Sequence, residues 1–533
     1  MIQQQITDKA KELINNNKLN EAENILLGLE DKYSIFELAK LRKIQGRTRE
    51  AEQLYLKSLS MTSEIKSNID SDINIELGRI YSDYGNIEKA KNYYNNGLGS
   101  ISLEKNIYKE LGILYARTGQ YEKAKENLEK AIRLFPTDIR ANFALAIVYI
   151  CLGKNELAKM IFNKLLSNKE VKADKFLYNK ILNEYEILMK KEILESKPIE
   201  IRNALTTKCN AGCRYCSVWK DGGRWNQSEK ITKEVVDLFP YLQKVHWLGG
   251  EVFLYNGFDD ILEEGFRYDN LTQTILTNGL LLNEKILRKL AKGKEKRIKL
   301  IIAIDAGKKE TYEYLRRGSS WDKLCANLEL IKEINHEGNR IYTIFNAVIS
   351  KSNYKEMFDM VEMAHKYDFD KIRFMNILGD SDENIFLRRD MHAIEYIGQV
   401  NPLVEKKAKE YGLEYENHLV KKEEKYYYND TELKTISNNE FNLCKADFKC
   451  SYPWKRVLID QRGPIRPCER CSDWLGDTNK QTIKEFWNSK PMQIYRKHFA
   501  EGYVCGGRGY NLQDNIYGGP NDISEWSNYP SIT

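Results

Sequence analysis

Three features are missing from this 533-residue sequence, and each absence excludes a class of protein. No run approaches the roughly 18 consecutive apolar residues of a membrane-spanning helix, and the opening MIQQQITDKAKEL lacks the apolar core of a secretory signal. A strong excess of one charge is also missing, since 83 basic and 77 acidic residues leave a net charge of +6. We therefore expect a soluble, cytoplasmic protein with no membrane and no nucleic-acid partner.

Cysteine is sparse, with ten residues in the whole chain. Thiols stay reduced in the cytoplasm, so these residues are candidates for metal binding or catalysis before disulfides. Cys151 and Cys325 stand alone in expected helices, where small buried hydrophobic side chains are the simplest interpretation. The other eight fall into two groups: Cys209, Cys213 and Cys216, and then Cys444, Cys450, Cys468, Cys471 and Cys505.

The N-terminal third repeats with a period of 34 residues, and four classes of residue share it. They are Leu77, Leu111 and Leu145; Tyr81, Tyr115 and Tyr149; Ala90, Ala124 and Ala158; and Tyr94, Leu128 and Phe162. A packed helix pair alone would give a 3.6-residue period. The pattern matches the tetratricopeptide repeat (TPR), in which small residues such as Gly78 and Gly112 let two helices approach closely. We expect four or five repeats over residues 1–170, forming an all-α solenoid.

A chain of this length needs three or four folding units, and the pattern changes after the solenoid. Residues 171–198 indicate a helical linker. Six apolar runs then alternate with amphipathic segments: 199–205, 244–248, 271–276, 298–304, 340–349 and 371–377. This alternation predicts parallel βα units in an open sheet or a barrel, with ligands at the carboxyl ends of the strands.

The first cysteine group directly follows the first expected strand. Three thiolates within eight residues leave a coordination position open, which a closed structural zinc site does not do. The C-x3-C-x2-C spacing of Cys209, Cys213 and Cys216, with the aromatic Tyr215 before the third cysteine, resembles the radical S-adenosylmethionine (SAM) family. The triplet taken alone also fits a zinc or other three-thiolate site. The resemblance implies a partial (β/α)6 TIM-like barrel over 199–392 and a [4Fe–4S] cluster that binds SAM.

Later strand ends carry residues that resemble the family's SAM contacts. Gly249, Gly250 and Glu251 resemble the element that receives the SAM amino group, and a carboxylate facing an ammonium is physically sensible. The resemblance also extends to Thr277 and Asn278 after the third strand, to Asp305 near the ribose and to Arg316 at the SAM carboxylate. Arg317 could replace Arg316, and Asn346 is a weaker match. Ala303 stands where many relatives have serine. Taken singly, each residue also fits a turn, a helix cap or a solvated surface.

The second cysteine group resembles the SPASM/twitch extension of some radical SAM enzymes. We expect residues 393–440 to connect the barrel to a small α+β domain over 441–533. The resemblance implies one auxiliary [4Fe–4S] cluster, with the ligands Cys450, Cys468, Cys471 and Cys505 and with Cys444 in reserve. Arg508 stands where the pattern has its last cysteine, so the fourth ligand stays open. A structural zinc bound by the same four cysteines is the alternative.

The resemblance implies an enzyme that reductively cleaves SAM to a 5′-deoxyadenosyl radical, which abstracts hydrogen from its substrate. The solenoid favours a peptide or protein substrate, modified by oxidation, cross-linking or a related reaction. A second hypothesis is a dehydrogenase or epimerase for a sugar or other small molecule, whose repeats recruit a pathway partner. A third is a TPR adaptor with a degenerate barrel. The expected electron donor is a flavodoxin or ferredoxin, and the sequence identifies no general acid or base.

Overall fold

The structure is a computed structural model that describes residues 2–16, 18–45, 47–61, 68–83, 86–98, 103–216, 218, 223–293, 297–337, 340–377, 381–419, 451–467 and 474–501. The chain divides into two compact units, and the first contains residues 1–171. The second contains residues 172–337 and most of the chain that follows. No described helix combines the length and apolarity needed to cross a bilayer.

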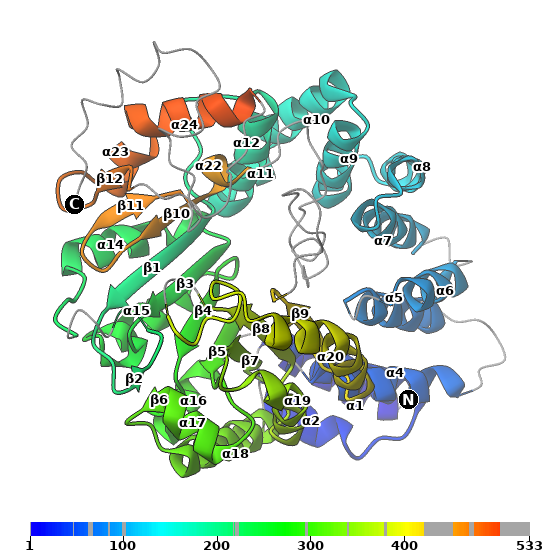
Figure 1. The fold of residues 1–533 in the computed structure, drawn as a ribbon. Coiled ribbons are helices and arrows are strands. Elements are labelled where there is room, and N and C mark those ends of the chain that lie inside the picture. Colours follow the sequence, from blue (N-terminus) through cyan, green and yellow to red (C-terminus); the bar gives the residue numbers. More distant parts are fainter. Residues whose placement is uncertain are drawn as a thin grey trace. The chain divides into compact units, whose positions relative to one another are not determined.

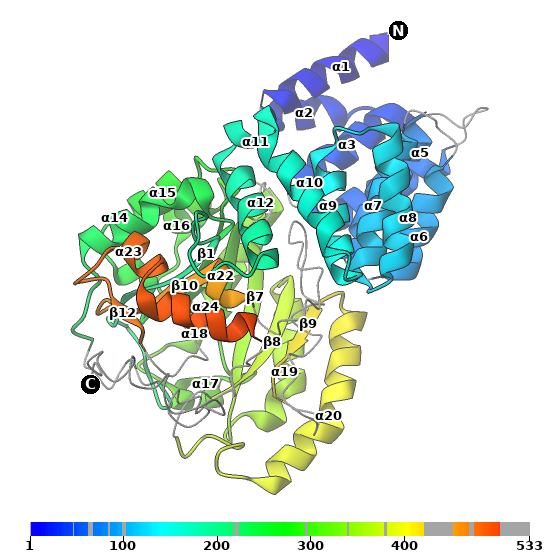
Figure 2. The same cartoon turned by 90° about the horizontal axis from the view of Figure 1, so that it is seen from above.

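Consecutive helices of the first unit pack as antiparallel hairpins (Figures 1 and 2). They are α1 (Ile2–Asn15), α2 (Leu19–Leu26), α3 (Lys32–Ile44), α4 (Thr48–Ser60), α5 (Asn68–Asp83), α6 (Ile87–Gly97), α7 (Glu104–Arg117), α8 (Tyr121–Leu134), α9 (Ile139–Cys151) and α10 (Asn155–Ser167). The described helices therefore form five hairpins, and the expected TPR region is confirmed.

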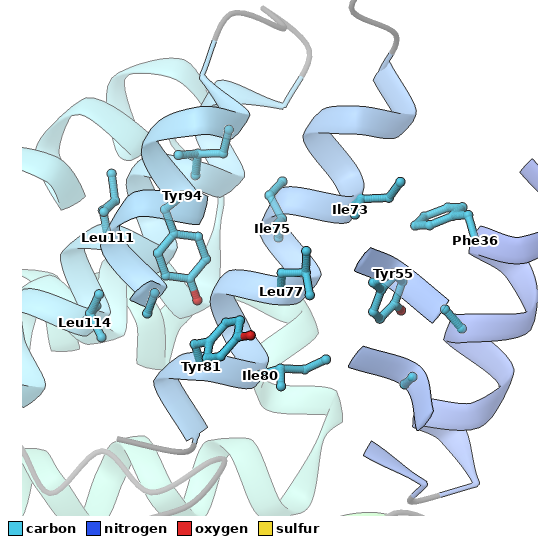
Figure 3. Close-up of a cluster of buried hydrophobic side chains, with 14 residues drawn as sticks. Phe36, Tyr55, Ile73, Ile75, Leu77, Ile80, Tyr81, Tyr94, Leu111 and Leu114 are labelled. Carbon is cyan, nitrogen blue, oxygen red and sulfur yellow. The ribbon is translucent and has the colours of Figure 1, made fainter. Parts of the chain in front are cut away.

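The 34-residue period is explained by how the two helices of a hairpin touch. A Cβ added at Gly78 in α5 would lie 2.4 Å from the ring of Tyr94 in α6. One added at Gly112 in α7 would lie 2.5 Å from Leu128 in α8. Because both glycines face a large side chain, a larger residue would force the helices apart. Figure 3 shows Tyr94 among the buried side chains that join neighbouring hairpins.

The second unit is built on an open sheet of ten strands in the order β12-β11-β10-β1-β3-β4-β5-β7-β8-β9. Its strands are β1 (Glu200–Thr206), β3 (Lys244–Gly249), β4 (Thr272–Thr277), β5 (Ile298–Ala303), β7 (Tyr342–Ile349), β8 (Lys371–Asn376), β9 (Glu414–Asn417), β10 (Arg456–Ile459), β11 (Pro464–Arg466) and β12 (Gly476–Asp477). All neighbours from β10 to β9 are parallel. The six predicted strands are β1, β3, β4, β5, β7 and β8, so the expected parallel α/β domain is confirmed.

The helices that follow these strands cover one face of the sheet (Figure 2). They are α14 (Glu229–Asp237), α15 (Phe258–Gly265), α16 (Glu284–Leu290), α17 (Lys309–Leu315), α18 (Trp321–Glu337), α19 (Met357–Lys366) and α20 (Met391–Glu410). Trp247 of β3 shows the packing, since its fully buried ring meets the edge of Phe258 in α15 at 5.8 Å between centroids. The opposite face of each strand is therefore the inner face of the curved sheet.

The C-terminal region joins this sheet directly. Strand β10 pairs in parallel with β1, and β11 returns antiparallel to β10 through a turn at Gly463, whose φ is +110°. The remaining elements there are α22 (Tyr452–Lys455), α23 (Ile483–Trp487) and α24 (Lys490–Ala500). The described part of 441–533 thus shares a sheet with the barrel strands, and β9 lies within the segment expected to be a connection.

Residues of the expected helical linker belong to the second unit. The helices are α11 (Lys169–Ala173) and α12 (Lys175–Leu188). Asn183 donates to the carbonyl of Trp454 at 2.5 Å. The fully buried Arg496 of α24 donates to the carbonyl oxygens of Glu192, Pro453 and Trp487 at 2.7–3.0 Å. These bonds hold α12, α22 and α24 together, while the domain boundaries at 170, 198, 392 and 440 stay predictions.

Candidate active site

The three cysteines of the first group lie in one loop after the carboxyl end of β1. Cys209, Cys213 and Cys216 are half-buried free thiols, and each lies close enough to influence the others electrostatically. Burial raises the pKa of Cys209, and it raises that of Cys213 to about 11. Because cysteine binds iron as the thiolate, a cationic cluster would offset this cost of ionisation.

A second pairing fixes the far side of this loop. Cys213 belongs to β2 (Gly212–Cys213), which pairs antiparallel with β6 (Arg316–Arg317). Arg214 donates its backbone N–H to the carbonyl of Leu315 at 3.0 Å and its Nε to the carbonyl of Tyr314 at 2.8 Å. The cysteine loop is therefore held to the segment at the end of α17 by hydrogen bonds within the protein.

Gly249 and Gly250 are required by the close approach of β3 to the cysteine loop. Gly249 has a φ of +140°, and a Cβ there would lie 2.5 Å from the carbonyl oxygen of Thr206. A Cβ at Gly250 would lie 2.3 Å from the carbonyl oxygen of Lys208. The backbone N–H of Glu251 donates to that same Lys208 oxygen at 2.8 Å. The two glycines thus let the cysteine loop dock on the end of β3.

Glu251 is fully buried beside this loop. It accepts hydrogen bonds from the hydroxyl of Thr277 and from the backbone N–H of Asn278, both at 2.8 Å. Burial raises the pKa of its carboxyl to about 7, although these hydrogen bonds oppose the shift. The Asn278 side chain donates to Asn210 at 2.7 Å and reaches the sulfur of Cys209 at 3.8 Å. The ends of β3 and β4 therefore contact the cysteine loop through one polar network.

Asp305 and Arg316 pair with each other. Arg316 contacts one Asp305 carboxylate oxygen through Nη2 at 2.5 Å and Nε at 2.8 Å, and the Tyr215 hydroxyl donates to the same oxygen. The backbone N–H of Val348 donates to the second oxygen at 2.7 Å. Asn353 fixes the Asp305 carbonyl at 2.6 Å, where the backbone has a left-handed φ of +62°. This pairing links the cysteine loop to β5 and β7.

The predicted site residues of the barrel therefore gather at the carboxyl edge of the sheet, around the cysteine loop. Arg317 is exposed, whereas Arg316 is buried. Sequence reasoning missed Asn210 and Asn353. Asn210 could have been recognised as a site residue because it lies inside the cysteine motif. Nothing in the sequence around Asn353 marks that residue.

The described residues fit an iron–sulfur cluster. Three free thiols of one loop face a region that holds a buried carboxylate but no competing fourth cysteine among the residues with described positions. Within those residues, no three histidine, cysteine or acidic side chains converge on a single-ion site. The thiolates of an iron–sulfur cluster do not have to converge on one ion, because each thiolate binds a separate iron.

The second cysteine group is outside the described residues. Cys444, Cys450, Cys468, Cys471 and Cys505 therefore stay predicted ligands of an auxiliary cluster. The two isolated cysteines differ from the expectation, since Cys151 and Cys325 are half-buried and not buried. Cys151 is moreover disulfide-bonded, so the general expectation of reduced thiols does not hold for it in this structure.

Family models match three regions of the chain. Residues 203–348 match the radical SAM superfamily, and residues 450–507 match the SPASM iron–sulfur cluster-binding domain. The chain therefore contains a radical SAM domain. Residues 71–100 and 106–138 match tetratricopeptide repeats. Its cofactors are an iron–sulfur cluster with SAM and an auxiliary iron–sulfur cluster.

Curated relatives of the enzyme match its radical SAM region. GTP 3′,8-cyclase of Clostridium perfringens (strain SM101 / Type A) is 27% identical over 189 residues, which cover 33% of this chain and 55% of the relative. Molybdenum cofactor biosynthesis protein 1 of Dictyostelium discoideum is 27% identical over 188 residues, covering 33% of this chain and 28% of the relative. The chain thus spans about half the length of the cyclases that it matches.

Solved structures with a related arrangement have low identity. Streptococcus suis SuiB bound to S-adenosylmethionine has a TM-score of 0.43 and 18% identity, covering 68% of this chain and 82% of SuiB. The anSMEcpe structure with bound AdoMet has a TM-score of 0.41 and 16% identity, covering 56% of this chain and 83% of that one.

Proposed function

We propose that this enzyme reductively cleaves SAM and abstracts hydrogen from a peptide or protein substrate that the tetratricopeptide repeats capture. The observation that carries the proposal is the loop of Cys209, Cys213 and Cys216 docked beside the buried carboxylate of Glu251. When bound, the reduced cluster supplies the electron that converts SAM to methionine and the 5′-deoxyadenosyl radical, which removes the hydrogen atom.

The chain's own residues bind and orient SAM. Cys209, Cys213 and Cys216 would hold the cluster through three thiolates, which would leave one coordination position open for SAM. Glu251 accepts the amino group, and it does so as a carboxylate because the ammonium offsets the burial that raises its pKa. Gly249 and Gly250 leave room beside it, since neither has a side chain.

The remaining SAM contacts come from neighbouring strand ends. Thr277 and Asn278 orient Glu251 and face the methionyl end. Asp305 and Arg316 hold the ribose and the carboxylate, so SAM competes with the ion pair that they form with each other. Tyr215 keeps its hydrogen bond to Asp305 and fixes the loop next to the adenosyl group.

We propose that Cys450, Cys468, Cys471 and Cys505 would hold an auxiliary cluster, with Cys444 in reserve. Such a cluster would supply an acceptor for the electron that remains on the product. A flavodoxin or ferredoxin of the cytoplasm delivers the electron that starts each turnover.

Two features support a polypeptide substrate. The five described helix hairpins form a solenoid, and solenoids of this type offer an extended surface to peptides. The chain also combines this solenoid with a SPASM domain. A second candidate is a small-molecule substrate, which the match to GTP 3′,8-cyclases favours, although that match covers only 33% of the chain.

The first experiment tests cluster binding and SAM cleavage. Anaerobically reconstituted wild type, Cys213→Ala and the matched control Cys325→Ala are compared for iron content, electron paramagnetic resonance and 5′-deoxyadenosine formation with dithionite. We expect cleavage by the wild type and the control, and at least a hundredfold loss in Cys213→Ala, because a thiolate ligand is missing. Equal cleavage by all three proteins, or none by the wild type, contradicts the proposal.

The second experiment separates the two substrate classes. The reconstituted enzyme receives either the peptide fraction or the small-molecule fraction of one cell extract, and 5′-deoxyadenosine is measured over the uncoupled rate. A several-fold stimulation by peptides, with a mass change on a peptide, supports the proposal. Stimulation by the small-molecule fraction alone favours the second candidate.

A further inference from the structure

Exposed basic residues lie in or against the cysteine loop. They are Lys208, Arg214, Arg224 and Arg317, which together we call the basic rim. Within the described part of the chain, no carboxylate forms an ion pair with any of them. The exposed Glu313, which shortly precedes Arg317, accepts the backbone N–H of Trp321 at 3.1 Å instead. The positive charge of the basic rim is therefore not neutralised by described residues.

Backbone contacts place two members of the basic rim in neighbouring segments. The backbone N–H of Thr207 donates to the carbonyl of Trp225 at 2.9 Å, and the backbone N–H of Trp225 donates to the Thr207 hydroxyl at 2.9 Å. A Cβ added at Gly223 would lie 3.6 Å from the Cα of Lys208. Arg224 stands between Gly223 and Trp225, so it lies beside the start of the cysteine loop.

The other two members lie at the strand pair that fixes the far side of the loop. Arg317 of β6 is in register with Gly212 of β2, and the two strands lie side by side in Figure 1. The guanidinium of Arg214 lies over the ring of Tyr314, 3.8 Å from its centroid, while its Nε is bonded to the Tyr314 carbonyl. The charge of Arg214 is therefore held in a fixed place at the surface.

Two aromatic side chains are exposed among these cations. Trp225 is 50% exposed and Tyr314 is 46% exposed. Tryptophan, tyrosine and arginine are the residues that contribute most to binding in protein–protein interfaces. A small anion is a poor ligand for this surface, because the four cations are exposed to water and a single exposed ion pair is weak. The composition therefore favours an acidic protein as the partner.

The position of the basic rim indicates what such a partner would do. Lys208 and Arg214 are the sequence neighbours of Cys209 and Cys213, two of the proposed cluster ligands. A protein that covers these side chains is separated from the bound cluster only by the loop itself. The surface is therefore suited to electron delivery.

We propose that an acidic flavoprotein of the flavodoxin type docks on the basic rim and reduces the cluster there. The partner class rests on the function proposed above. Opposite charges on the two surfaces steer their encounter. The flavin of such a protein binds at the carboxyl edge of its sheet, and Trp225 offers this flat aromatic ring an apolar contact. One electron passes from the reduced flavin to the cluster, and no bond forms or breaks.

The first measurement is binding without turnover. The reconstituted full-length enzyme is titrated calorimetrically with an oxidised bacterial flavodoxin of net negative charge, at ionic strengths of about 0.01 M and about 0.15 M. We expect binding that weakens with salt and that is about tenfold weaker in Lys208→Glu/Arg224→Glu. The matched control is Arg267→Glu, which should leave the affinity unchanged. Arg267 is also exposed, but it follows the end of α15 and so lies at the opposite edge of the sheet.

The second measurement separates docking from SAM cleavage. Formation of 5′-deoxyadenosine is driven either by dithionite, which needs no docking, or by subsaturating reduced flavodoxin. Lys208→Glu/Arg224→Glu should keep the dithionite-driven rate and lose about tenfold of the flavodoxin-driven rate. Lys208→Gln/Arg224→Gln removes the charges without reversing them, so it guards against misfolding and should show a smaller loss. Failure of the wild type with dithionite contradicts the proposed function and leaves the titration readable.

Several outcomes overturn the inference. They are equal affinity of the wild type and Lys208→Glu/Arg224→Glu, an equal loss of affinity in Arg267→Glu, or no binding of the flavodoxin at either ionic strength. Binding and support of cleavage by an acidic ferredoxin, where the flavodoxin gives neither, also overturns it.

Discussion

The two units of the chain surround a partly buried arginine in different ways. In the repeats, Arg79 of α5 bridges Glu76 at 2.5 Å and Glu110 of α7 at 2.8 Å, and Arg140 of α9 reaches Glu110 at 3.5 Å. Lys43 of α3 pairs with Glu76 and extends this series of ion pairs, which we call the ladder. On the inner face of the sheet, the hydrogen-bond partner of Arg373 among the described residues is the side-chain amide of Asn346, and burial lowers the pKa of Arg373.

The carboxylates show the same contrast. Burial alone would raise the pKa of Glu110, but Arg79 and Arg140 outweigh it and the pKa is lowered. Glu251 has no such partner at close range, and burial raises its pKa to about 7. Charges in the repeats are therefore balanced within the chain and hold helices together. At the strand ends, Asp305 and Arg316 pair with each other, but Glu251 has no cation within ion-pair distance among the described residues, which is the arrangement expected of a binding site.

The largest expected effect comes from breaking the ladder. Arg79→Met leaves the buried Glu110 with only the longer contact to Arg140, and we expect a loss of about 3 kcal/mol in the free energy of unfolding of the repeats. Urea unfolding followed by circular dichroism measures it, with Lys91→Met as the control for an exposed pair. The double variant Arg79→Met/Glu110→Leu should recover most of the loss, and a single-variant loss below about 1 kcal/mol contradicts the ladder.

A smaller effect is expected from Glu251 and pH. The pKa of its carboxyl is about 7 in the folded protein and about 4.5 in the unfolded chain. Between these two pH values the carboxyl is therefore protonated in the folded protein and ionised in the unfolded chain. Stability of this region should therefore fall by about 2 kcal/mol as the pH rises from about 5.5 to 7.5. Hydrogen exchange of the Asn278 amide in cluster-free protein measures this change in local stability. Glu251→Gln at each pH is the reference, and an equal pH response in that variant excludes Glu251 as the cause.

The smallest effect is expected where the charge is not used for folding. Arg373→Met removes the cost of burying a cation and also removes one hydrogen bond to Asn346, and these opposing changes should leave the free energy of unfolding within about 1 kcal/mol of the wild type. Urea unfolding of the cluster-free protein checks this. A loss above about 2 kcal/mol would make Arg373 a structural residue like Arg79 and would remove the contrast between the units.

Local sequence patterns predicted much of this architecture. The 34-residue period identified the helix hairpins because the contact between Gly78 and Tyr94, one on each helix, recurs in the next repeat between Gly112 and Leu128. Alternating apolar runs located six strands of the sheet because a buried strand is short and apolar. The cysteine motif and Gly249–Gly250 are also local, since both serve contacts at the end of a strand.

Other features depend on contacts between distant segments, which no local pattern records. Strand β10 lies beside β1, although more than 250 residues separate Asn203 from its partner Ile459. Arg316 was expected at the SAM carboxylate and Asp305 near the ribose, and only the structure shows that the two pair with each other. The positions of the auxiliary ligands are not described, so that part of the prediction is untested.

The sequence by itself determined the order of the domains, the repeat, the six strands and the cysteine loop, because each of them is marked by the spacing of particular residues along the chain. Only the tertiary structure decided which charges are paired. Arg79 and Arg373 are both arginines in regular elements, and nothing in their sequence neighbours separates them. Their difference arises because α7 brings the carboxylate of Glu110 to the first, whereas β7 brings the neutral amide of Asn346 to the second.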